Sequence, residues 1–177
     1  MSEVAVTAPR NPMLEVRVEK VVLNIGVGEP GDRLEKAATV LGKLTGMKPV
    51  KTKAKKSVRD FNVRKGEEIG CKVTLRGAKA EEFLKSAFTA VSNKLKASSF
   101  DPRGNVGFGI KEHIYLPGVR YDPELGIFGL DVCVKLSRRG ARVSQRRYKP
   151  SKQGRTHTVS AQEAQSFLKE RFGIEVE

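Results

Sequence analysis

Alternation of apolar and polar residues predicts strands in several parts of the chain. In the clearest stretch, Cys71, Val73 and Leu75 alternate with Lys72 and Thr74. Successive side chains of a strand point to opposite faces of a sheet, so each such stretch is expected to bury one face. The predicted strands cover residues 16–27, 49–54, 69–76, 106–110 and 130–136.

Apolar residues at three-to-four spacing predict helices over residues 32–45, 79–96 and 160–172. Asp32 is expected to cap the first helix, and Ser160 with Glu163 forms a capping box for the last. Strands and helices therefore follow one another in the order β, α, β, β, α, β, β, α. This order predicts an α+β fold with a mostly antiparallel sheet and helices packed on one face.

The chain is expected to form one domain over residues 14–177, preceded by a loose N-terminal arm at residues 1–13. A basic loop between the second and third strands should project from this domain. A second basic segment, residues 135–155, is interpreted as an exposed C-terminal arm that precedes the last helix. No internal repeat is present in the sequence.

The positive charge of the chain is concentrated in these two segments. The net charge is +14 and the pI about 10.0. Residues 48–65 contain eight basic residues and one acid, and residues 135–155 contain nine basic residues and no acid. Such clusters favour a polyanionic partner, because cations on phosphates release condensed counterions, although an anionic membrane surface would attract the same charge.

Several other classes of protein find little support in the sequence. Cys71 and Cys133 lie far apart, which favours a reduced, cytoplasmic setting. The N-terminus lacks the apolar run of a signal peptide, and no stretch is long and apolar enough to span a bilayer. His113 and His157 have no partners at metal-binding spacing, and no catalytic set of residues can be assembled. We therefore expect neither a cofactor nor a metal nor a small-molecule substrate, and a protein that is not an enzyme.

A glycine motif at residues 26–31 matches the G-x-G-x-x-G pattern of dinucleotide-binding proteins. An oxidoreductase of that kind would carry an acid about 20 residues later, whereas residues 46–51 contain none. A turn that lets another backbone or an RNA approach closely is the preferred interpretation. The G-x-x-G of residues 104–107 precedes a strand pattern, and not the helix expected in a KH domain.

The strands predict a polar face. If Leu23, Ile25, Val73 and Leu75 point inward, their neighbours point outward. The outward set expected on this basis contains no acid and consists of Asn24, Lys51, Lys53, Lys72, Thr74 and Arg76. Such a face suits structured RNA, since its donors match phosphates, 2′-hydroxyls and base edges, and it carries no aromatic residue for base stacking. A merely solvated face remains the alternative.

Four motifs resemble the L-five family of large-subunit ribosomal proteins. They are Asn24-Ile25-Gly26-Val27-Gly28-Glu29, Thr45-Gly46-Met47-Lys48-Pro49, Lys53-Ala54-Lys55-Lys56-Ser57 and Ile69-Gly70-Cys71-Lys72-Val73-Thr74-Leu75-Arg76-Gly77. The likeness runs in order from about residue 12 to residue 137, and the residues that follow are similar to the archaeal and eukaryotic branch. Met47 stands where the family often has Gln.

The resemblance implies binding of 5S ribosomal RNA and its attachment to the central protuberance of the large subunit. Other implied partners are large-subunit ribosomal RNA, P-site transfer RNA and neighbouring ribosomal proteins, with no membrane. Among the expected 5S contacts, the resemblance assigns Asn24, Thr74 and Arg76, and the polar face and the first basic segment add Lys48, Lys51, Lys53 and Lys72. The expected transfer-RNA contacts in the basic loop are Lys55, Lys56, Arg59, Arg64 and Lys65. The expected contacts of the basic arm with other ribosomal RNA are Arg138, Arg139, Arg142, Arg146 and Arg147.

Overall fold

The computed structural model describes residues 11–177, so most of the expected N-terminal arm lies outside the described residues. The helices of this range are α1 (Asp32–Thr45), α2 (Ala78–Ala90) and α3 (Ala161–Phe172). Its strands are β1 (Val16–Gly26), β2 (Val50–Lys53), β3 (Glu68–Leu75), β4 (Lys94–Leu95), β5 (Asn105–Ile110), β6 (Leu130–Arg138) and β7 (Glu175–Val176). The α+β class predicted from the sequence is confirmed.

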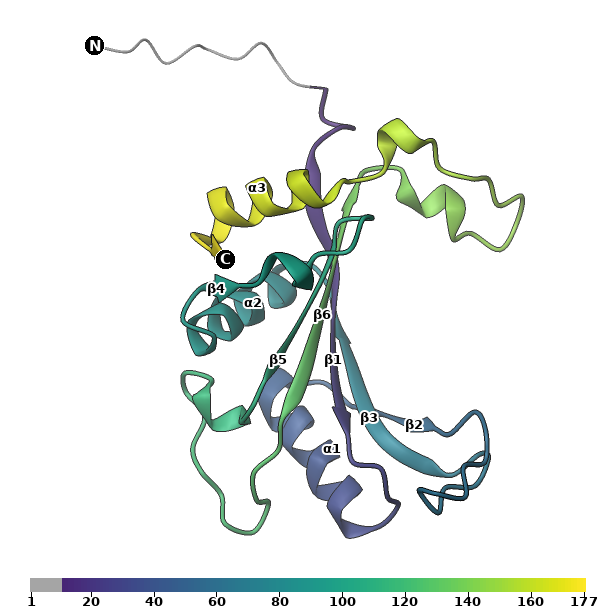
Figure 1. Ribbon diagram of the computed structural model, residues 1–177, viewed down its shortest axis with the longest axis vertical. Helices are drawn as coiled ribbons and strands as arrows, with labels where there is room; N and C mark the ends of the chain where they lie inside the picture. The colour runs from purple at the N-terminus through teal and green to yellow at the C-terminus, as the bar shows by residue number, and fades with distance from the viewer. Residues whose placement is uncertain (1–10) are drawn as a thin grey trace.

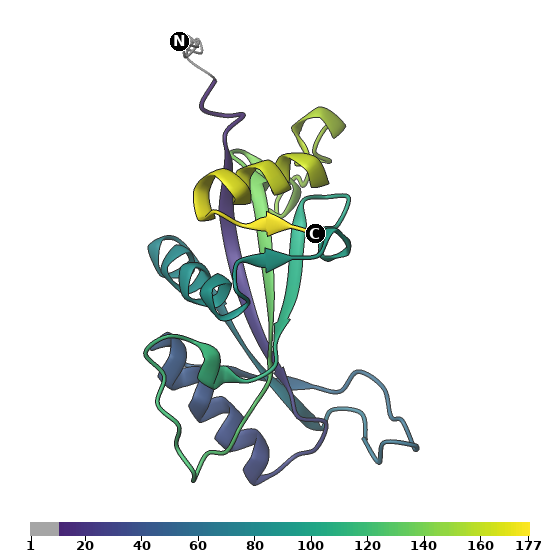
Figure 2. The same cartoon turned by 60° about the vertical axis from the view of Figure 1, so that its left-hand side comes forward.

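The main sheet has the strand order β2-β3-β1-β6-β5, and all of its neighbouring strands are antiparallel (Figure 1). β1 is the central strand, and β1 and β6 are the longest strands of the sheet. Aliphatic side chains at alternate positions explain this arrangement, since both strands bury one face against the helices. β4 and β7 pair in parallel as a separate small sheet near the C-terminus, visible in Figure 2.

The helices cover one face of the main sheet, as Figure 1 shows, and the hydrophobic core fills the space between the two layers. Phe88 of α2 is central to this core. Its ring stacks on Phe108 of β5 at a centroid distance of 5.3 Å and meets the edge of Phe172 of α3 at 5.4 Å. One aromatic side chain thus joins two helices to the sheet.

The end of α2 and the capping residue of α1 differ from the prediction. α2 ends at Ala90 and not near residue 96, because Ser92 and Asn93 adopt left-handed conformations with φ of 58° and 56°. Leu95 is still buried, but as part of β4. The residue that caps α1 is Gly31, whereas Asp32 lies in the first turn, so the expected Asp32 cap is wrong.

The capping box predicted for α3 is confirmed. The backbone N–H of Glu163 donates to Ser160 Oγ at 3.3 Å, and that of Ser160 donates to Glu163 Oε2 at 3.1 Å. These two bonds satisfy donors that a helix N-terminus otherwise leaves free.

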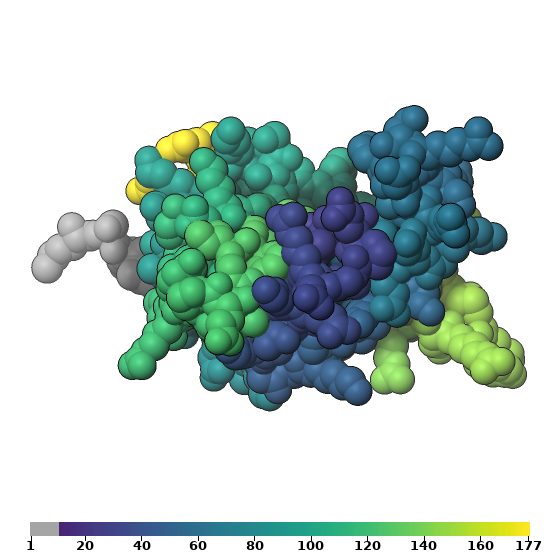
Figure 3. All heavy atoms as spheres, turned by 90° about the horizontal axis from the view of Figure 1, so that it is seen from below, coloured from purple at the N-terminus to yellow at the C-terminus, as the bar shows by residue number. Residues whose placement is uncertain are grey.

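Both basic segments project from the side of the sheet that the helices leave uncovered. The basic loop (residues 55–66) connects β2 to β3, and the basic arm (residues 138–155) begins at the last residue of β6. Figure 1 shows the loop at lower right and the arm at upper right, with the helices on the left. In Figure 3 the loop (blue) and the arm (yellow-green) again extend to one side of the body.

Candidate nucleic-acid interface

The helix-free surface of the sheet, called here the open face, carries the residues predicted to point outward from β1 and β3. Asn24 lies opposite Lys72, and Val22 lies opposite Thr74, in the antiparallel register of these strands. Their neighbours Leu23 and Val73 are buried in the core. Directly paired residues share a face, so Asn24, Lys72 and Thr74 emerge together. Arg76 follows β3 by one residue and is exposed.

The phase predicted for β2 is wrong. Val50, and not Lys51, lies opposite Lys72 and is 60% exposed on the open face. Lys51 lies opposite the buried Cys71, so its side chain leaves the sheet on the helix side. There its ammonium group pairs with Glu35 of α1 at 3.2 Å and with Glu68 at 3.4 Å.

A shift of register ends the regular pairing of β2. Thr52 lies opposite Gly70, but the next residue, Lys53, lies opposite Glu68. Simple alternation therefore does not extend to Lys53, which is exposed beside an acidic residue. Lys48 is also exposed and lies two residues before β2.

The open face extends over two more strands, β6 and β5, whose places in the sheet were not predicted from the sequence. β6 contributes Asp131, Cys133 and Lys135, and Asn24 lies opposite Asp131. β5 adds Asn105 opposite Lys135. The outward residues predicted from the first three strands include no acid, but the larger open face does contain one, because Asp131 of β6 lies opposite Asn24.

A second acidic residue at this surface, Glu19, forms an ion pair with a lysine. Glu19 lies where the β1–β6 register shifts, and its carboxylate pairs with Lys135 at 3.0 Å. Burial raises the pKa of Glu19, but hydrogen bonds from Lys135, Gln145 and Ser137 and the Lys135 charge lower it, with a net downward shift of the pKa. This carboxylate is charged at neutral pH, and Lys135 is its partner.

The basic loop has a defined conformation. Val58 and Val63 exchange backbone hydrogen bonds of 2.9 and 3.1 Å, and Asn62 at the tip has φ of 53°. At its base, Lys65 N donates to Ser57 Oγ at 2.9 Å and Arg64 N donates to Glu67 Oε2 at 2.7 Å. The loop cations are all exposed, and none forms an ion pair with residues 11–177: Lys55, Lys56, Arg59, Arg64 and Lys65.

Arg138 is a structural residue of the basic arm. Its side chain is only 11% exposed, and its guanidinium donates to Glu163 Oε1 at 2.6 Å and to the Thr156 carbonyl at 2.7 Å. The ion pair ties the end of β6 to the start of α3. Since these donors are occupied, the expectation that Arg138 is free to bind RNA is not supported by its geometry.

The other arginines of the basic arm remain available. Arg139, Arg142, Arg146 and Arg147 are exposed, and none forms an ion pair with another described residue. Short-range bonds hold the arm: His157 Nε2 lies 2.7 Å from the Arg139 carbonyl, and Arg146 Nε donates to the Lys149 carbonyl at 2.9 Å. The arm therefore presents its cations from a fixed backbone.

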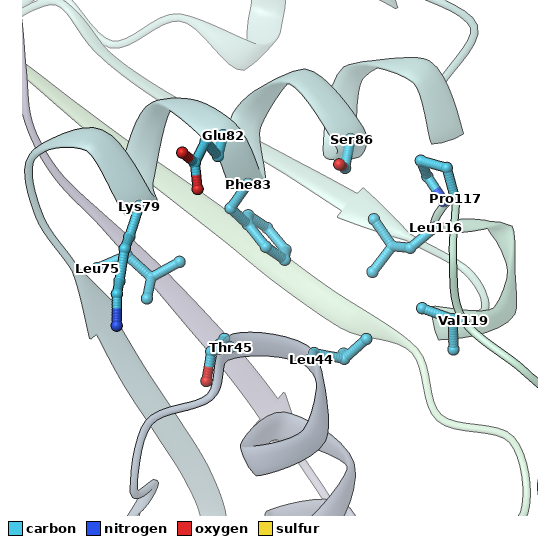
Figure 4. A pocket seen from close by; sticks show the side chains of 10 residues that line it. All are labelled: Leu44, Thr45, Leu75, Lys79, Glu82, Phe83, Ser86, Leu116, Pro117 and Val119. Atoms are coloured by element: carbon cyan, nitrogen blue, oxygen red, sulfur yellow. The ribbon is translucent and has the colours of Figure 1, made fainter.

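A hollow on the helix side is lined largely by apolar side chains. This hollow of about 300 Å³ lies between α1, α2 and residues 116–119, and Figure 4 shows that Phe83, Leu116 and Val119 supply much of its lining. The polar side chains at its rim, such as Lys79 and Glu82, form no hydrogen bond with each other or with another described side chain.

The remaining candidate chemical groups have structural explanations. His113 is buried, and its Nδ1 accepts a hydrogen bond from Phe128 N at 3.3 Å. Burial raises the pKa of Cys71 to about 11, so its thiol stays protonated at neutral pH. Among residues 11–177, no cluster of acidic, His or Cys residues is placed to hold a metal ion. None of the helices in the same range has the length and apolarity of a transmembrane span.

The open face and the two basic segments, in which most cations form no ion pair with residues 11–177, are features typical of proteins that bind a polyanion. Comparisons with known proteins agree with this class. Residues 11–64 match the family model of ribosomal protein L5, and residues 68–174 match the model of the C-terminus of the same ribosomal family.

Three archaeal relatives extend the match over nearly the whole chain. The large ribosomal subunit protein uL5 of Sulfurisphaera tokodaii is 56% identical over 97% of this chain and 98% of its own length. The uL5 protein of Pyrobaculum aerophilum is 54% identical, with 94% and 93% covered, and that of Archaeoglobus fulgidus is 52% identical, with 94% and 93% covered. The chain belongs to the ribosomal L5 family of the large ribosomal subunit. It is therefore a ribosomal protein and not an enzyme, and the dinucleotide-binding alternative is set aside.

Proposed function

We propose that the open face binds 5S ribosomal RNA and thereby attaches it to the central protuberance of the large subunit. The observation that carries this proposal is the joint placement of Asn24, Lys72 and Thr74 on the helix-free side, with Arg76 at its edge. The family resemblance assigns Asn24, Thr74 and Arg76 to 5S contact.

The chemistry of this face suits folded RNA better than splayed single strands. Asn24, Thr74 and Arg76 offer amide, hydroxyl and guanidinium donors, which match 2′-hydroxyls, phosphates and base edges of a wide minor groove. None of the paired open-face positions of β1, β3 and β6 carries an aromatic ring on which a base could stack.

The two flanking segments extend this role to other RNA partners. In the proposal, the basic loop contacts P-site transfer RNA and the basic arm contacts large-subunit ribosomal RNA. Support comes from their exposed and unpaired cations and from their projection on the same side as the open face (Figures 1 and 3).

Replacing Arg76 by Ala tests the 5S assignment. The loss of a specific contact should weaken 5S binding by about 1–3 kcal/mol, measured by filter binding at moderate salt. Arg33→Ala is a matched control, because Arg33 is also an exposed arginine but lies on α1, in the helix layer. Its affinity should stay close to that of the unmodified protein.

Competition with an unrelated duplex RNA at the same salt concentration completes this test. Specific binding predicts that the Arg76 variant loses affinity for 5S RNA and retains its affinity for the duplex. Unchanged 5S affinity, or an equal loss for both RNAs, would contradict the proposed site.

A further inference from the structure

The glycine turn after β1 and the basic loop enclose an apolar hollow that the proposed 5S site does not use. Its volume is about 570 Å³, and Val27 and Gly28 line one side of it. Val58, Phe61 and Val63 of the loop line the other. The turn is the G-x-G-x-x-G motif of residues 26–31, whose interpretation as a dinucleotide-binding site was rejected above.

Both walls of the hollow are fixed by backbone hydrogen bonds. The N–H groups of Val27 and Gly28 donate to the Ile69 carbonyl at 3.0 and 2.9 Å, and Val58 and Val63 bond to each other. Gly28 has φ of +86°, and a Cβ added there would meet no atom within 4 Å. The motif therefore shapes the turn, and no other part of the described chain fills the space beside it.

Phe61 is the most exposed apolar residue of this lining. Its side chain is 76% exposed at the tip of the loop, and Val58 beside it is 38% exposed. Lys55 and Lys56 stand at the rim without ion pairs among the described residues, and Glu29 is the acidic residue of the lining. The site thus combines an accessible ring, apolar walls and cations.

We propose that this hollow holds one unpaired nucleobase of a bound RNA, stacked on the Phe61 ring. This inference rests on the proposed function, in which the basic loop faces RNA. Lys55 and Lys56 would meet the phosphates on either side of the base, and Glu29 would accept a hydrogen bond from an exocyclic amino group. The charge of the loop, five cations against the single acid Asp60, favours RNA over an apolar segment of another protein.

The test uses the full chain and two RNA hairpins that differ by one unpaired residue. One hairpin carries a single bulged 2-aminopurine, and the other is fully paired. The unmodified protein should bind the bulged hairpin about tenfold more tightly, in line with one base–aromatic stack, and should change the 2-aminopurine fluorescence, because the base leaves its neighbours in the RNA. Phe61→Ala should abolish both effects, whereas Phe61→Trp should keep them.

Tyr148→Ala is the matched control, since Tyr148 is also 76% exposed and lies on the other basic segment. This variant should retain the tenfold preference. Equal affinity of the unmodified protein for both hairpins would overturn the proposal and point to a protein occupant. Loss of the preference in Tyr148→Ala would also overturn it, because the base would then bind at the arm.

Measurements with 5S RNA separate this proposal from the one on which it rests. Phe61→Ala should leave 5S affinity unchanged, while Arg76→Ala should lower 5S affinity and keep the preference for the bulge. If the protein preferred the bulged hairpin but did not bind 5S RNA, the proposed base site would stand and the proposed 5S-binding face would be wrong.

Discussion

Lys51 and Lys72 lie on neighbouring strands, but their side chains leave the sheet on opposite faces. Lys72 shares the open face with Asn24, whereas Lys51 is held by Glu35 and Glu68 on the helix side. Charge at these positions is equal, so any difference in their effect on RNA binding must come from geometry.

The two lysines therefore form a matched pair of variants. Lys72→Gln should weaken 5S binding by about 1 kcal/mol, because it removes a charged donor from the open face. Lys51→Gln should leave the affinity nearly unchanged, because its side chain leaves the sheet on the helix side, away from the open face. Isothermal titration calorimetry measures both. A larger effect of Lys51→Gln would mean that RNA approaches from the helix side.

Alternation predicted side-chain direction correctly where the strand has a buried aliphatic face. Leu23, Ile25 and Val73 fix the phase of β1 and β3, and the outward placement of Asn24 followed from them. β2 has four residues, Val-Lys-Thr-Lys, and lies at the edge of the sheet. Either phase of that sequence is equally plausible, so its phase depends on pairing with β3, which the sequence does not show.

At the scale of elements, one ion pair joins the start of the basic arm to α3. Arg138 joins the end of β6 to Glu163, and Glu163 also completes the capping box of Ser160. The arm and the helix N-terminus are thus stabilised by the same carboxylate.

Arg138→Gln should loosen the arm without unfolding the domain. The buried guanidinium is lost, so local opening of residues 139–155 should become several-fold more frequent. Limited trypsin digestion followed by mass spectrometry would detect faster cleavage in the arm. Cleavage within residues 55–66 serves as the internal control and should keep its rate. Uniform acceleration at both segments would indicate global destabilisation instead.

The basic loop gives a prediction about division of labour. Replacing Arg64 and Lys65 by Ala should leave 5S affinity within about twofold, because neither residue lies on the open face. The same double variant should weaken transfer-RNA binding to reconstituted ribosomes. The control replaces Lys20 and Lys72 by Ala; both lie on the open face, and this variant should bind 5S RNA more weakly and bind transfer RNA normally. If the loop variant lost affinity for 5S RNA and for transfer RNA to the same extent, the open face and the basic loop would not have separate roles.

Most elements were predictable, but some of their ends were not. The spacing of Val91 and Leu95 continues the α2 pattern, so the helix was expected to extend to residue 96. The chain leaves the helix early because β4 pairs with β7, some 80 residues away. Such long-range pairing has no local signal.

At the scale of the whole molecule, charge is divided between the two layers. The open side carries the unpaired cations of the loop and arm, whereas α2 has two cations and two acids. The sequence located the basic segments, but only the folded chain shows that both project on the helix-free side of the sheet (Figure 1). The strand order β2-β3-β1-β6-β5 also brings β6 beside β1, which adds Lys135 and Asp131 to the face.

Salt dependence can show whether this arrangement, or net charge alone, determines binding. The logarithm of the 5S association constant should fall linearly with the logarithm of salt concentration, with a slope set by the phosphates contacted. Replacing Lys72 and Arg76 by Gln should reduce the magnitude of that slope by about 1.5–2 if both contact phosphates.

Replacing Lys36 and Lys85 by Gln removes the same charge from the helix layer, where both side chains are exposed. Because counterions are released only where cations meet phosphates, this control should change the slope by less than about 0.5. Binding titrations across a series of potassium chloride concentrations measure both slopes. If both double variants reduced the slope equally, RNA binding would depend on the total charge of the protein, and the open face would not be a specific binding surface.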